Sequence, residues 1–165
     1  MVAALLSVAV LLVAAGAPSS GWQPPSAATA SRAASFVTTL ARESPDHDGV
    51  PLRRYLIEDL DGDGACEVLE YVSAFERSPG FLNAELAPAF EWVKVYRDRA
   101  GEYREDTTSF RGFLAGRRQS YEFWLRVLDN PAVLGQDSQA LIRANGEEFK
   151  RILKGYVDRT RGTER

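Results

Sequence analysis

Apolar residues recur at helical spacing in three segments of this chain. Residues 31–41 form the first, which should end before Pro45 because a residue that precedes proline disfavours helical backbone. Residues 113–130 form the second, and Pro131 follows it directly. Residues 141–156 form the third. The pattern therefore predicts one helix near the N-terminus of the domain and two helices at its C-terminus.

Both C-terminal segments carry aromatic residues on their apolar sides. Tyr121 and Trp124 belong to the first of them, and Phe149 belongs to the second. Such stripes form hydrophobic core far more often than they form ligand sites. The last helix also needs an N-cap, and Asp137 or Ser138 has a suitable side chain.

The middle of the chain has the pattern of strands. Residues 52–58 fit either a short strand or a short helix, and residues 67–75 are rich in apolar side chains. Residues 90–97 alternate, with aromatic side chains facing one way and valines the other. A glycine-containing turn at 98–101 and a return strand at 102–106 complete a hairpin. The predicted fold class is α+β: a small antiparallel sheet, one N-terminal helix and two C-terminal helices.

Residues 1–30 differ in composition from the rest of the chain. Residues 2–17 are small and apolar without a charged side chain, which is typical of a secretory signal peptide. Small residues offer a cleavage site after Ala17 or after Ala30, and an uncleaved membrane anchor is the alternative. We expect residues 31–165 to form a single domain that is secreted or periplasmic, with no membrane contact apart from the signal segment.

Composition narrows the possible chemistry. The net charge of −3 is small and no basic stripe is present, so nucleic acid is not an expected partner. The single cysteine, Cys66, excludes an internal disulfide bond. The single histidine, His47, lies between two aspartates in a predicted turn, where a surface position is more common than a catalytic one. We find no nucleophile elbow, phosphate loop or zinc-binding helix motif, so an enzyme is not the favoured class.

Regularly spaced acidic residues between positions 59 and 70 are the most specific feature of the sequence. Aspartates occupy positions 1, 3 and 5 of this run, glycine position 6 and glutamate position 12. Ca²⁺ binds about six to eight oxygen ligands, which alternate carboxylates in a tight loop supply. Mutual repulsion among carboxylates with no basic residue between them also favours a cation. The predicted Ca²⁺ ligands are the side chains of Asp59, Asp61, Asp63 and Glu67, the carbonyl oxygen of Ala65, and Glu70.

This spacing resembles two kinds of calcium-binding unit. Residues 59–70 resemble the loop of an EF-hand, which implies a helix on each side and Glu70 as a bidentate ligand. The longer stretch 55–106 resembles a single FG-GAP or VCBS-type unit. That resemblance implies a strand on each side, with Glu67 as a ligand and Glu70 on the opposite face. We favour strands because Pro51 leaves room for barely two helical turns before the loop, but both geometries remain open.

Three functions are compatible with these features. The first is an exported binding or structural module in which Ca²⁺ has a structural role. The second is an EF-hand calcium sensor, and the third is a small secreted hydrolase, which would need a cleft lined by carboxylates with perturbed pKa values. A proline-bounded loop at residues 78–88, with Phe81 and Leu82 at its tip, is the predicted contact surface for a protein partner.

Overall fold

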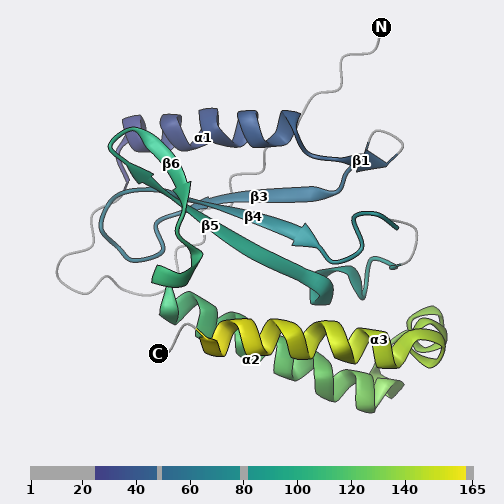
Figure 1. Ribbon diagram of the computed structural model, residues 1–165. Helices are drawn as coiled ribbons and strands as arrows, with labels where there is room; N and C mark the ends of the chain where they lie inside the picture. The colour runs from purple at the N-terminus through teal and green to yellow at the C-terminus, as the bar shows by residue number, and fades with distance from the viewer. Residues whose placement is uncertain (1–24, 48–49, 79–81, 163–165) are drawn as a thin grey trace, which may run out of the picture.

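The fold consists of a sheet between one helix and a pair of helices. The structure, a computed structural model, describes residues 25–47, 50–78 and 82–162. Figure 1 shows α1 on one side of the sheet, with α2 and α3 on the other. This is the predicted α+β arrangement. The elements are α1 (Ala27–Arg42), β1 (Asp46–His47), β2 (Val50–Pro51), β3 (Arg53–Glu58), β4 (Glu67–Ser73), η2 (Ala87–Phe90), β5 (Glu91–Arg99), β6 (Glu102–Glu105), η3 (Thr107–Ser109), α2 (Arg111–Asp129), η4 (Pro131–Val133) and α3 (Gln136–Arg161).

The main sheet has the strand order β3-β4-β5-β6, and each neighbouring pair is antiparallel. Antiparallel neighbours can be joined by short connections, as β3–β4 and β5–β6 are, whereas the connection from β4 to β5 is longer and includes η2. The segment at 52–58, which the sequence left open between strand and helix, forms strand β3. Strands β1 and β2 form a separate two-stranded pair just before β3. The acidic run occupies the connection between β3 and β4.

The two faces of the sheet bury different side chains, as a period of two requires. On one face Val68 of β4 packs against α1 together with Ala33 and Val37. On the other face Leu69 and Val95 pack in a second cluster that includes Phe110 at the start of α2. Successive residues of β4 therefore serve separate apolar layers, and a shift of one residue in register would exchange them.

Helices α2 and α3 pack against each other and against the segment that precedes β5. Tyr121 of α2 and Phe149 and Leu153 of α3 belong to one buried cluster with Leu86 and Phe90. Phe149 and Phe90 have ring centroids 4.7 Å apart. The aromatic stripes of the two C-terminal helices are thus core, as predicted.

The N-terminus of α3 corrects the prediction of its cap. Gly135, and neither Asp137 nor Ser138, is the N-cap residue. Ser138 is buried and its hydroxyl group is engaged by Asn83 and Glu85. The Glu85 carboxylate accepts a hydrogen bond from the Gly135 N–H at 3.2 Å. A side chain distant in sequence thus caps this helix, so no local pattern could indicate it.

Helix α1 begins earlier than the sequence pattern predicts. It starts at Ala27, where the Ser26 hydroxyl oxygen accepts a hydrogen bond from the Thr29 N–H at 3.2 Å. Residues 27–30, which the prediction placed before the domain, form its first turn, and cleavage after Ala30 would remove that turn. The predicted signal segment up to residue 24 lies outside the described residues. Within the described residues, no helix combines the length and apolar character needed to cross a bilayer.

Candidate metal centre

The acidic run forms the turn of the β3–β4 hairpin. The strand register ends at the pair Glu58–Glu67, so residues 59–66 connect two strands and not two helices. Gly62 and Gly64 have φ values of 75° and 82°, a left-handed conformation that glycine adopts with little strain. Of the two geometries left open by the sequence, the chain has the one with a strand on each side.

Asp59 organises this turn through its carboxylate. Its Oδ1 accepts hydrogen bonds from the backbone N–H groups of Gly62 and Asp63, at 2.7 and 3.1 Å. Its Oδ2 accepts one from the N–H of Gly64 at 3.0 Å. Short acidic side chains form such turns because they reach backbone donors a few residues ahead. The run is therefore held in a compact ring in which carboxylates converge.

Three carboxylates meet at the base of the turn. Asp59, Asp61 and Glu67 each offer an oxygen, and these oxygens lie within 4.8 Å of one another. Glu67 is the buried member, with 0 % exposure, and its Oε2 accepts a hydrogen bond from the Leu60 N–H at 3.0 Å. Burial raises the pKa of Glu67, and the charges of Asp61 and Asp63 add to the rise, although the Leu60 bond and Arg97 oppose it.

Arg97 supplies the positive charge that the acidic run itself lacks. It lies on β5, where its guanidinium group pairs with Asp61, and its Nε is 3.4 Å from Oε1 of Glu67. The same guanidinium group lies 4.5 Å from the centroid of the Phe110 ring. Sequence reasoning missed this residue because it is distant along the chain. The signal is the strand register, since Val68 pairs with Tyr96 and Arg97 is the next residue along β5.

Two further predicted ligands lie in the same turn. Asp63 is exposed and outside the group of three carboxylates, and its Oδ1 accepts a hydrogen bond from the Ala65 N–H at 2.8 Å. This contact keeps Asp63 and the Ala65 backbone close together. Their ligand roles remain predictions.

Glu70 does not join the group at the turn. It is 1 % exposed, and its Oε1 accepts a hydrogen bond from Arg53 at 2.7 Å while its Oε2 accepts one from the Tyr96 hydroxyl at 2.7 Å. Lys94 lies 3.5 Å from the same Oε2. Because side chains alternate along a strand, Glu70 faces the opposite side of the sheet from Glu67. The structure thus gives Glu70 a different set of partners from the one that an EF-hand geometry requires.

The single cysteine, Cys66, does not belong to the carboxylate group. Cys66 is buried among the residues that pack under α1, and burial raises the pKa of its thiol. A thiol in this state is a weak nucleophile and a weak metal ligand. The side chain of His47 lies outside the described part of the chain. Among the described residues, the donor set at the turn therefore consists of carboxylate oxygens.

Comparison with protein-family models, with curated protein sequences and with solved structures finds no match to this chain.

Proposed function

We propose that this chain is an exported calcium-binding protein in which Ca²⁺ at the β3–β4 turn has a structural role. The observation that carries the proposal is the environment of Glu67. Its carboxylate is fully buried, converges with those of Asp59 and Asp61, and stands directly opposite Glu58 in the register. A buried carboxylate among like charges is costly unless a cation compensates it.

The donor set favours Ca²⁺ over softer metals. Carboxylate oxygens predominate, and Ca²⁺ accepts such ligands in irregular geometry, whereas Mg²⁺ demands a near-ideal octahedron. Zinc and copper prefer nitrogen or thiolate ligands, and the buried Cys66 lies in a different cluster. Asp59, Asp61 and Glu67 would hold the ion, and Asp63 and the Ala65 carbonyl group would complete its oxygen shell.

A structural role fits this hairpin better than a sensor role. The turn connects strands that are paired over their whole length, from Arg53–Val72 to Glu58–Glu67. A sensor of the EF-hand type needs helices that reorient on binding, and here the flanking elements are strands. A single site of the extracellular kind binds with a dissociation constant of roughly 10⁻⁴–10⁻³ M, which suits Ca²⁺ outside the cell. Such binding adds about 1 kcal/mol of stability at a modest excess of the ion.

Fewer observations support a hydrolase or a protein partner at the loop 78–88. A hydrolase would need paired carboxylates in a cleft, and two cavities among the described residues, one between α3 and strands β4 and β5 and one between α1 and β6, are lined by a single acid, Glu102. The predicted contact loop at 78–88 is only partly described. Leu82 packs against the buried cluster of α2 and α3 and does not form an exposed tip, and Phe81 lies outside the described residues. A protein partner at this loop therefore stays a prediction.

Calcium titration of chelator-treated protein tests the proposal. Isothermal titration calorimetry should give one site per chain, and Ca²⁺ should raise the melting temperature while Mg²⁺ at the same concentration should raise it much less. Equal melting temperatures in EGTA and in millimolar Ca²⁺, with no heat of binding, would overturn the proposal.

A second candidate role for the turn follows from Arg97. Its guanidinium group contacts both Asp61 and Glu67, so the arginine itself could serve as the compensating cation. In that case the turn would be a charge cluster neutralised within the chain. If the arginine is removed, the metal-site role predicts that Ca²⁺ stabilises the variant, and the arginine-only role predicts that it does not.

We expect Arg97→Met to tighten Ca²⁺ binding if the turn is a metal site. The variant keeps an apolar stem against Phe110 but removes a positive charge beside the ion, which should lower the dissociation constant by about tenfold at low salt. It should also lower the melting temperature in EGTA, because the carboxylates then lack any cation. Arg99→Met is the matched control, since Arg99 lies on the same strand and pairs with Asp106 instead. A destabilised variant that Ca²⁺ fails to rescue would favour the arginine-only role.

A further inference from the structure

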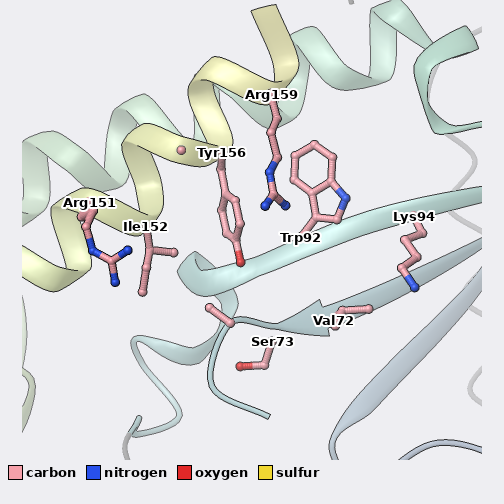
Figure 2. Close-up of a pocket in the computed structure, with 10 residues that line it drawn as sticks. Val72, Ser73, Trp92, Lys94, Arg151, Ile152, Tyr156 and Arg159 are labelled. Carbon is pink, nitrogen blue, oxygen red and sulfur yellow. The ribbon is translucent and has the colours of Figure 1, made fainter. Parts of the chain in front are cut away.

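A cleft lies between the C-terminal half of α3 and the adjacent part of strands β4 and β5. Its volume is about 480 Å³, within the range of small-molecule sites. In Figure 2, Tyr156 and Arg159 extend from α3 toward β5, where Trp92 and Lys94 are located. The acidic turn is at the other end of β4, so this cleft is separate from the candidate metal centre.

Positive charge is concentrated in this cleft. Lys94, Arg151 and Arg159 line it, and no aspartate or glutamate does. Arg151 pairs with Glu148 on the exposed side of α3, and Lys94 is 3.5 Å from Glu70. Among the described residues, Arg159 has no carboxylate within ion-pair distance. A guanidinium group without a counter-ion beside two other cations is a strong attractor for an anion.

The aromatic rings of the cleft hold Arg159 in place. Its guanidinium carbon is 5.5 Å from the centroid of the Trp92 ring and 5.9 Å from that of Tyr156, and Figure 2 shows it between the two side chains. Cation–π contacts restrict the rotamers of the arginine, so less entropy is lost when it binds a ligand. The same rings provide apolar surface beside the charge.

Gly155 keeps the α3 wall of the cleft open. It lies within the C-terminal half of α3, and in a helix interior glycine costs about 0.5–1 kcal/mol relative to alanine. A Cβ atom added there would meet no heavy atom within 4 Å, so packing does not require the glycine. A larger side chain at this position would project into empty space beside Arg159 and Arg151.

We propose that this cleft binds a small organic anion, a carboxylate or phosphate group attached to an apolar body. Arg159 would pair with the anionic group bidentately, Lys94 would add a second donor, and the apolar body would lie against Trp92 and Tyr156. Lys94 also lies 3.5 Å from the buried Glu70, but its ammonium group has three N–H donors and can bind an anion as well. The proposal does not depend on Ca²⁺ at the turn.

The test uses phenyl phosphate, benzoate and inorganic phosphate as probes, with two-dimensional NMR of the full chain. We expect saturable shifts of the Trp92 indole N–H and of the α3 amides around Gly155, and tighter binding of phenyl phosphate than of inorganic phosphate. Arg159→Gln should weaken phenyl phosphate by at least about tenfold. Arg143→Gln is the control, because Arg143 is exposed on the same helix outside the cleft and should not alter affinity.

A second variant tests the cleft independently of charge. Gly155→Leu should fill the space and abolish phenyl phosphate binding while the far-ultraviolet circular dichroism stays unchanged. Gly155→Ala should retain binding and raise the melting temperature, because alanine favours helix. Absence of saturable shifts with all three probes, shifts located elsewhere, or unchanged affinity in both Arg159→Gln and Gly155→Leu would overturn the proposal. Binding of benzoate but not of phenyl phosphate would assign the site to carboxylates, and the reverse to phosphates.

Discussion

Glu67→Gln is expected to abolish the calcium-dependent rise in melting temperature while leaving the chelated protein at least as stable as the wild type. The glutamine retains an acceptor for the Leu60 N–H and the shape of the side chain. It removes a fully buried charge that faces Asp59 and Asp61. Without Ca²⁺ that charge destabilises the turn, so its loss is neutral or favourable; with Ca²⁺ it is a ligand, so its loss is costly.

The expected size follows from mass action. In about 10 mM Ca²⁺ a site of the extracellular kind would add roughly 1–3 kcal/mol to the free energy of unfolding, or roughly 3–8 °C to the melting temperature. Differential scanning calorimetry in EGTA and in Ca²⁺ measures this difference directly. Glu58→Gln is the matched control, because Glu58 is the exposed residue paired with Glu67 across the hairpin.

The Glu58→Gln control should keep most of the calcium-dependent rise in melting temperature. A Glu67→Gln protein that still gains several degrees in Ca²⁺ would show that the ion binds elsewhere. A variant that is much less stable than the wild type in EGTA would instead show that the Arg97 contact, and not a metal, compensates Glu67.

Glu70→Gln is expected to show the opposite behaviour, with a loss of stability and an unchanged affinity for Ca²⁺. The carboxylate of Glu70 accepts two short hydrogen bonds, from Arg53 and from the Tyr96 hydroxyl, and is 1 % exposed. Hydrogen bonds to a charged group each contribute about 1.5–3 kcal/mol to stability, and the glutamine amide of the variant would keep part of this contribution. We expect a loss of about 2 kcal/mol at neutral pH, measured by urea unfolding.

In the wild type, the free energy of unfolding at acid pH should depend on the ionisation of the same carboxylate. Burial works to raise the pKa of Glu70, but the hydrogen bonds from Tyr96 and Arg53 and the charge of Lys94 outweigh it, so the pKa lies below its ordinary value of 4.5. A lowered pKa means that the folded state binds the proton less tightly than the unfolded state. The stabilisation is therefore present above pH 4.5 and is lost as the pH falls through the lowered folded-state pKa.

In Glu70→Gln, the free energy of unfolding should no longer show this loss as the pH falls. Glu102→Gln is the control, because the Glu102 side chain is 71 % exposed and forms an ion pair with Arg104, two residues along β6. Calorimetric titration separates the two geometries that the sequence left open: a large drop in Ca²⁺ affinity in Glu70→Gln would contradict the strand geometry and the partners assigned here.

The sequence indicated most elements because their signals are local. Helical periodicity in 113–130 and 141–156, and alternation in 90–97, depend on one face of an element being buried, and that face is written in consecutive residues. The run at 59–70 likewise indicated a tight acidic turn, since Gly64 and the alternate aspartates act within a few residues of one another. The start of α1 was missed because residues 27–30 contain only small side chains, three alanines and Thr29, which do not mark an apolar helix face.

By itself, then, the sequence determined the three helices, the strands from residue 67 onward, the position of the acidic turn and the set of carboxylates available to it. Only the tertiary structure decided which carboxylates converge, because the register of β4 against β3 and β5 directs Glu67 to the turn and Glu70 to Arg53 and Tyr96. It also decided that Arg97 stands beside the turn and that Lys94 and Arg159 line one cleft. Both results depend on pairing between distant segments, and the net free energy of that pairing comes from burial over the whole sheet and not from any local pattern.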